Sequence, residues 1–172
     1  LDADPNVEWE FMPASSAELT PEEIAGYDGL IVLGPRVTAA TLEGAEQLAL
    51  VARFGVGYDN VDVPACTEHG VLLSITPDGV RRPMATIVLT YILALSHRLL
   101  QKDRLTREGR WAEKFDYMGT GITGKTVGII GLGNIGREGV ELAAPLEMNF
   151  IAADPNVDAA QAAAIGVNLV DL

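Results

Sequence analysis

Short apolar runs separated by turn residues set the pattern of the first third of the chain. These runs predict strands at residues 7–11, 29–33, 50–54 and 71–75. The last three are almost continuously apolar, which is typical of parallel strands covered on both faces. Between the last two, the sequence predicts a two-turn helix with Asp62 as its N-cap, Pro64 in its first turn and Gly70 at its left-handed end. Strands alternating with short helices indicate an α/β architecture.

The pattern changes after residue 75. Residues 76–79 predict a turn, and residues 84–107 predict one long helix. The first half of this helix is apolar on nearly every side, so we expect it to be buried all round, partly against a second subunit. Its second half, residues 98–107, is amphipathic and basic. We therefore place a domain change near residue 84, with one domain at 1–83 and another at 84–172.

A glycine motif follows the next predicted strand, residues 125–130. Gly131, Gly133 and Gly136 form G-x-G-x-x-G, and a helix pattern comes directly after them. The first glycine permits the tight turn, the second lets backbone approach a pyrophosphate, and the third lets the helix pack closely on the strand. Free N–H groups at the start of the helix, with Asn134 and Ile135, would bind the phosphates. We call residues 131–136 the glycine turn.

An acidic residue stands where a dinucleotide site needs one. A second predicted strand, residues 149–153, ends at Asp154, eighteen residues after Gly136. A carboxylate at this distance accepts hydrogen bonds from the adenosine ribose and would repel a 2′-phosphate, which favours NAD over NADP. The alternatives are a purely structural glycine turn and, for Asp154, a strand-end turn residue before Pro155.

Composition excludes several other classes of function. The formal net charge is −12, which disfavours nucleic acid as a partner. The longest apolar stretch, residues 85–95, is too short to cross a bilayer. Cys66 is the only cysteine and has no activating neighbour, so we expect a small, partly buried residue on a short helix in a reducing, cytoplasmic protein. There is no cluster typical of a metal site.

Several segments in order resemble the D-isomer-specific 2-hydroxyacid dehydrogenase family. They are the loop RFGVGYDNVD at 53–62, the pair Thr76 and Pro77, the segment REGRW at 107–111, and GKTVGIIGLGNIGR at 124–137. The resemblance spans nearly the whole chain and is far more specific than the glycine motif alone.

The resemblance implies a partial flavodoxin-like substrate domain joined to the first half of a Rossmann NAD-binding domain. In the family, the backbone at positions matching Val56 and Gly57 binds the substrate carboxylate, and Met84 matches a position that contacts the nicotinamide. Without the family, the loop would be a plain strand-ending turn, and Met84 a packing residue at the start of a helix. The resemblance also implies a homodimer formed through the region 85–107 and a small 2-hydroxy or 2-keto acid as substrate.

Two departures from the family pattern limit what this chain is expected to do. Residues 78–85 lack the family's Asn-Ala-Glu-Ser pattern and instead carry Arg81 and Arg82, which could face an acidic substrate or simply solvent. The family's catalytic Arg, Glu and His would lie beyond Leu172, and neither His69 nor His97 stands in a context suited to replace them. We expect part of a longer NAD-dependent dehydrogenase. A non-catalytic NAD-sensing interaction protein and an inert folded fragment remain as alternatives.

Overall fold

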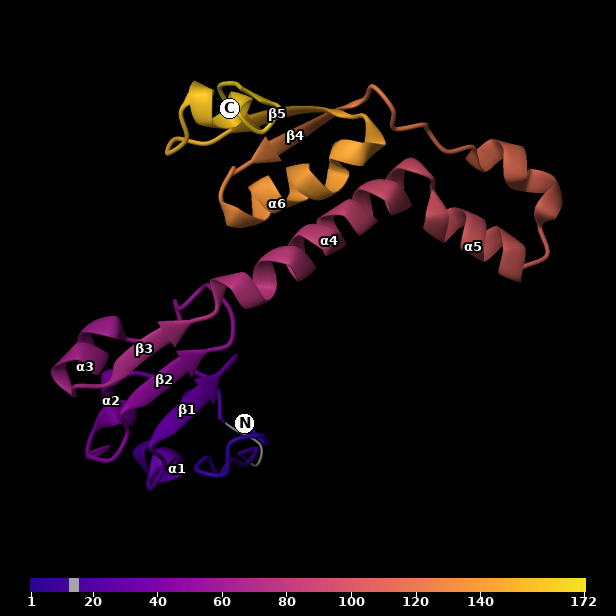
Figure 1. The fold of residues 1–172 in the computed structure, drawn as a ribbon. Helices are drawn as coiled ribbons and strands as arrows, with labels where there is room; N and C mark the ends of the chain where they lie inside the picture. Colours follow the sequence, from indigo (N-terminus) through magenta and orange to yellow (C-terminus); the bar gives the residue numbers. More distant parts are fainter. Residues whose placement is uncertain (13–15) are drawn as a thin grey trace. The chain divides into compact units, whose positions relative to one another are not determined.

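The computed structural model describes residues 1–12 and 16–172 and divides into two compact units (Figure 1). The first unit is Leu1–Pro77 and the second is Asp78–Leu172. The division falls a few residues before the expected change at residue 84. Each unit contains one parallel three-stranded sheet, which confirms the α/β class.

In the first unit, three of the four predicted strands are present and pair in sequence order. The elements are α1 (Pro21–Ile24), β1 (Gly29–Val32), α2 (Ala39–Leu42), β2 (Leu50–Arg53), α3 (Val63–Glu68) and β3 (Leu72–Ile75). The strand expected at 7–11 was wrong, because this segment pairs with no other described strand. Instead the rings of Trp9 and Phe11 meet edge to face, with centroids 5.3 Å apart, and Trp9 Nε1 donates a hydrogen bond to Asp2.

Helix α3 begins and ends as its residues predict. The Asp62 side chain accepts a hydrogen bond from the Ala65 N–H at 3.0 Å, and Gly70 has φ +70° just beyond the helix. Cys66 is buried on the inner side of this helix within the core of the unit. Burial, with a smaller contribution from Asp62, raises the pKa of the Cys66 thiol, as expected of an unreactive core residue.

The two sheets are covered on one face within the described chain, contrary to the expectation of burial on both faces. Leu30 and Val51 pair across β1 and β2 and are both buried. By contrast, Ile31, the next residue of β1, and Leu72, on the adjacent strand β3, are 63% and 71% exposed. In the second sheet Ile130 is 80% exposed. The cause is topological. Each new strand is added on the same side of the previous one, and right-handed crossovers between such strands place every connecting helix on the same face of the sheet.

The second unit begins with two helices where one was predicted. Helix α4 (Pro77–Ser96) starts seven residues early, so the turn expected at 76–79 was wrong; proline is favoured in the first helical turn. Helix α5 (Leu99–Arg107) follows a break at Arg98, which has φ +51°. The Ser96 carbonyl accepts a hydrogen bond from Thr120 at 2.7 Å, and Gly119 lies against the backbone of His97 so closely that a Cβ would stand 2.7 Å from its Cα.

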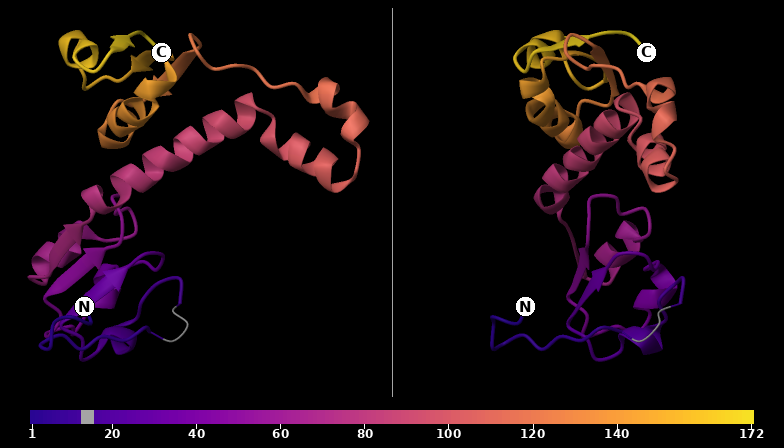
Figure 2. Two further views of the ribbon diagram at one scale, coloured as in Figure 1. Left: turned by 45° about the vertical axis from the view of Figure 1, so that its right-hand side comes forward. Right: turned by 90° about the vertical axis from the view of Figure 1, so that its right-hand side faces the viewer.

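No single helix in the described residues has the length and apolar composition to cross a membrane; only α4 and α5 together, bent by 61°, pass such a test. Helix α4 lies alongside α6 in both views of Figure 2, and its Leu89 and Ile92 pack against the core of the second unit. Among the described residues of this single chain, α4 is covered on only part of its surface, and the expected burial against a second subunit stays a prediction. An apolar strip along α4 and α5 is exposed, formed by Met84, Ile87, Val88, Tyr91, Leu95, Leu99 and Leu100.

After α5, the second unit continues with a 3-10 helix and then a β-α-β-α-β run. It comprises the 3-10 helix η1 (Trp111–Tyr117), β4 (Thr126–Ile130), α6 (Asn134–Ala143), the 3-10 helix η2 (Ala144–Leu146), β5 (Asn149–Ala153), α7 (Ala159–Ala163) and β6 (Val167–Leu169). The two strands predicted here are confirmed, and β6 completes a sheet of order β4-β5-β6. Its core, which includes Leu132, Val140 and Phe150, holds the glycine turn between β4 and α6.

Candidate functional site

The glycine turn has the backbone geometry that its glycines were predicted to allow. Gly131 has φ +91° and donates its N–H to the Ala153 carbonyl of β5 at 3.0 Å. A Cβ on Gly136 would stand 2.5 Å from the Gly131 carbonyl oxygen, so α6 is pressed against the turn. A Cβ on Gly133 would meet no protein atom within 4 Å, which leaves open space over the middle of the turn.

Helix α6 begins without a capping side chain. Gly133 is its N-cap, and the first helical hydrogen bond runs from the Arg137 N–H to the Gly133 carbonyl at 2.9 Å. The N–H groups of the first turn, including those of Asn134 and Ile135, therefore stay available for an outside acceptor. The helix dipole adds partial positive charge at the same point. This combination can bind an anion such as a phosphate.

Asp154 lies beside the glycine turn at the end of β5. Its Oδ2 accepts a hydrogen bond from the Leu132 N–H at 2.7 Å, and its Oδ1 accepts one from the Asn156 N–H at 2.8 Å. The second contact is the strand-end turn that was the structural alternative for this residue. The first contact joins the acid directly to the glycine turn. A carboxylate has about four lone-pair sites, so both roles are compatible with accepting further hydrogen bonds from a ligand.

The loop after β2 presents a second set of backbone donors, within the first unit. Gly55 is buried with φ +137°, and its N–H donates to Thr76 Oγ1 at 2.8 Å while its carbonyl accepts from the Thr76 N–H at 2.8 Å. The following Val56 and Gly57 are exposed. Their N–H groups donate to no acceptor among the described residues. Such a turn can bind a carboxylate.

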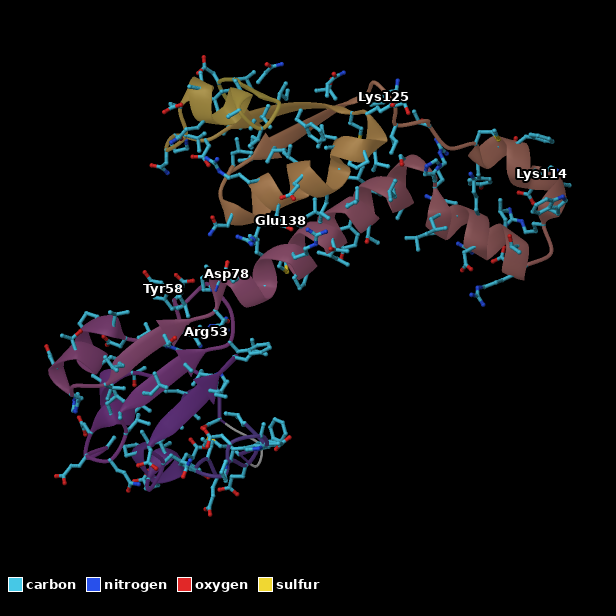
Figure 3. The ribbon with its side chains drawn as sticks, viewed as in Figure 1. Arg53, Tyr58, Asp78, Lys114, Lys125 and Glu138 are labelled. Atoms are coloured by element: carbon cyan, nitrogen blue, oxygen red, sulfur yellow. The ribbon has the colours of Figure 1, made fainter. Side chains whose placement is uncertain are left out.

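The remaining predicted residues lie on α4. Met84 is 46% exposed inside the helix, in its second turn and not at its start. Arg81 and Arg82 do not simply face solvent: Arg81 Nε lies 3.2 Å from Glu138 Oε2, and Arg82 Nη1 donates to Glu138 Oε1 at 2.9 Å. Figure 3 shows Glu138 on the side of α6 that faces α4.

Glu138 is the residue that the sequence analysis missed. It is 8% exposed on a helix whose other buried residues are Val140 and Ala143. A glutamate at a core-facing helical position, with two arginines unassigned elsewhere, is the signal that could have found it.

The described residues offer no other obvious chemistry. His69 and His97 are both exposed. No group of three or more His, Cys, Asp or Glu gathers with metal-site geometry in the described part of the chain.

Comparison with known proteins places this geometry in a family. The D-isomer specific 2-hydroxyacid dehydrogenase catalytic domain matches residues 2–132. A D-3-phosphoglycerate dehydrogenase of Archaeoglobus fulgidus is 36% identical over 96% of this chain, and the chain spans only 31% of that relative. A 2-hydroxyacid dehydrogenase structure from Ketogulonicigenium vulgare Y25 is 28% identical with a TM-score of 0.72, covering 84% of this chain and 45% of that one. An acyclic imino acid reductase in complex with NADPH and D-Arg is 25% identical with a TM-score of 0.72, covering 87% and 48%. The chain therefore belongs to the D-isomer specific 2-hydroxyacid dehydrogenase family.

Proposed function

We propose that this chain supplies the cofactor-phosphate site and the substrate-carboxylate loop of an NAD-dependent D-2-hydroxyacid dehydrogenase. The observation that carries the proposal is the hydrogen bond from the Leu132 N–H to Asp154, because it sets a ribose-binding acid against an uncapped, anion-binding helix start. In this interpretation the first unit is a partial flavodoxin-like substrate domain, and the second is the N-terminal part of a Rossmann domain.

The cofactor site fits NAD by its shape and charge. The open space at Gly133 allows a pyrophosphate to reach the N–H groups of the first turn of α6. Asp154 would accept hydrogen bonds from the adenosine ribose and would repel a 2′-phosphate, which favours NAD although one relative binds NADPH. Gly131 and Gly136 hold the turn, and Met84 would pack against the nicotinamide.

The reaction that we propose is hydride exchange between a small 2-hydroxy acid and NAD, with 2-keto acid reduction as the reverse. When bound, the nicotinamide supplies the hydride acceptor or donor. The N–H groups of Val56 and Gly57 would bind and orient the substrate carboxylate. No residue of this chain is assigned to proton transfer. In the family pattern a His transfers the proton, a Glu orients that His and an Arg clamps the substrate; no residue of this chain matches these three, so we expect the chain alone to be inactive.

Two further features complete the proposal. The exposed apolar strip of α4 and α5 would be buried by a second copy in a homodimer, because so large an apolar surface is unfavourable in water. A single buried cysteine suits a cytoplasmic protein. D-3-phosphoglycerate is the first substrate to test, since the relative from Archaeoglobus fulgidus carries that name.

Two measurements test the proposal. Titration of this chain with NADH, followed by nicotinamide fluorescence, should show saturable binding that NADPH matches only at higher concentration. The full-length protein should oxidise NADH with at least one member of a 2-keto acid panel. Binding without turnover by the full-length protein would favour a non-catalytic NAD-sensing interaction protein, and absence of binding would indicate an inert folded fragment.

A further inference from the structure

Two arginines at the start of α4 converge on one carboxylate of α6. Arg82 Nη1 donates to Glu138 Oε1 at 2.9 Å, and Arg81 Nε lies 3.2 Å from Glu138 Oε2. Arg81 also approaches Asp78 at 3.4 Å. The Arg82 contact is aligned as a hydrogen bond, whereas the Arg81 contact is not, so Arg81 acts mainly through its charge.

The burial of these groups is unequal, and this identifies the residue that depends on the others. The Glu138 side chain is 9% exposed, whereas those of Arg81 and Arg82 are 44% and 63% exposed. The arginines can turn into water if the contact is lost. The glutamate cannot, because removal of its partners would leave a buried charge without compensation.

Glu138 lies close enough to the start of α6 to influence the position of the first helical turn. It stands one helical turn after Asn134, on the same face of α6. Glu138, Asn134 and Arg81 line one hollow on the surface of the second unit. Gly136, between Asn134 and Glu138, is pressed on the Gly131 carbonyl. The helix start is therefore held on one side by the turn and on another by the arginines of α4.

The arginines lie on a part of α4 that needs such an attachment. Pro83 stands inside the helix and has no N–H to donate to the Gly79 carbonyl. The turn that carries Arg81 and Arg82 is thus held less firmly to the rest of α4 than an uninterrupted helix would be. Its contacts with Glu138 join this turn to α6.

We propose that Glu138, held by Arg81 and Arg82, is a positioning residue that sets the first turn of α6 for the cofactor pyrophosphate. This inference rests on the proposed function. Glu138 contacts no ligand directly. It acts by fixing the N–H groups that do, so its loss should weaken ligands that contain a pyrophosphate and spare a ligand that lacks one.

The test uses Glu138→Gln in the full chain with three ligands: NADH, ADP-ribose and adenosine. We expect the dissociation constants of NADH and ADP-ribose to rise about tenfold, equivalent to about 1.4 kcal/mol. The dissociation constant of adenosine, followed by ligand-observed NMR, should not change. Arg82→Gln should give a smaller rise, because Arg81 remains beside the carboxylate.

Asp103→Asn is the matched control, since it removes an exposed Asp–Arg ion pair with Arg107 on α5. It should leave all three affinities unchanged, and circular dichroism should show every variant folded. Unaltered NADH affinity in Glu138→Gln, or equal weakening of all three ligands, would overturn the positioning role, because equal weakening is what a merely structural contact produces. If the unmodified chain binds none of the ligands, the proposed function itself fails and this inference falls with it.

Discussion

Helices α3 and α6 both connect neighbouring parallel strands, but their first turns are completed differently. Helix α3 has Asp62 as its N-cap, and that side chain binds the Ala65 N–H. Helix α6 has Gly133 at the same position and no capping side chain. The Asp62 side chain occupies an N–H group in the first turn of α3, whereas the first turn of α6 has no such acceptor and, under the proposed function, binds an anion. On the basis of the proposed function, we call α3 the structural helix and α6 the binding helix.

Gly136→Ala should break the binding helix most severely. The new Cβ would stand 2.5 Å from a backbone carbonyl, so α6 must move away from β4. We expect the second unit to lose about 3 kcal/mol of stability in denaturant unfolding. We also expect NADH binding to become too weak to measure.

Gly139→Ala is the control for this variant, because it lies in the same helix with no atom within 4 Å of the added Cβ. Alanine there should stabilise the unit by about 0.5–1 kcal/mol. If both variants unfold at the same denaturant concentration, close packing at Gly136 is not what holds the helix.

Gly133→Asp should convert the binding helix into a self-capped one. The carboxylate would accept hydrogen bonds from the first turn of α6 and raise stability by a few tenths of a kcal/mol, on the order of the Asp-to-Gly difference at N-caps. It would also occupy the anion site, so we expect NADH affinity to fall about a hundredfold, or about 2.7 kcal/mol.

Gly133→Ala tests whether charge or bulk is responsible. It fills the same open space without a capping oxygen, so it should weaken NADH less than aspartate does. An NADH affinity in Gly133→Asp equal to that of the unmodified chain would show that the helix start is not the phosphate site.

The sequence predicted the parts of this comparison that depend on local backbone rules. Strand β4 follows from a short apolar run. The three glycines of the glycine turn and the N-cap of α3 each follow from the residue type at a single position. What it could not predict depends on contacts between distant segments. Glu138 meets Arg81 and Arg82 more than fifty residues earlier, and the break at Arg98 accompanies the contact of Gly119 with His97. The exposure of Ile31 and Leu72 on the uncovered face of the first sheet follows from the direction of the crossovers, which hydrophobicity alone does not encode.

Asp62→Ala should weaken the structural helix alone. Loss of the cap costs about 1 kcal/mol in the unfolding of the first unit. NADH affinity should not change, because the cap contributes nothing to the glycine turn. Urea unfolding followed by circular dichroism, with NADH titration in parallel, measures both quantities. A fall in NADH affinity as large as that expected for Gly133→Asp would remove the distinction between the two helices.

The smallest effect on stability should come from protonation of Glu23, in helix α1, at acidic pH. Glu23 accepts hydrogen bonds from the Thr20 N–H at 2.8 Å and the Ser16 hydroxyl at 2.9 Å, and these lower the pKa of its carboxyl below the ordinary 4.5. A carboxylate with a lowered pKa stabilises the folded state above pH 4.5, and that contribution is lost as pH falls through the folded value. Helix α6 has no acidic residue in its first turn.

The comparison of unmodified chain with Glu23→Gln isolates this contribution. The thermal midpoints of the two proteins should differ slightly at pH 7, and the difference should shrink as the pH is lowered below 4.5. A protonated Glu23 is uncharged, as glutamine is, so both side chains then accept these hydrogen bonds more weakly than the carboxylate does. A difference that stays constant across this range would mean that the charge on Glu23 does not support α1. A difference that shrinks in acid would add α1 to the comparison of α3 and α6: Glu23 supplies an acceptor at the start of α1, whereas under the proposed function α6 receives one only with its ligand.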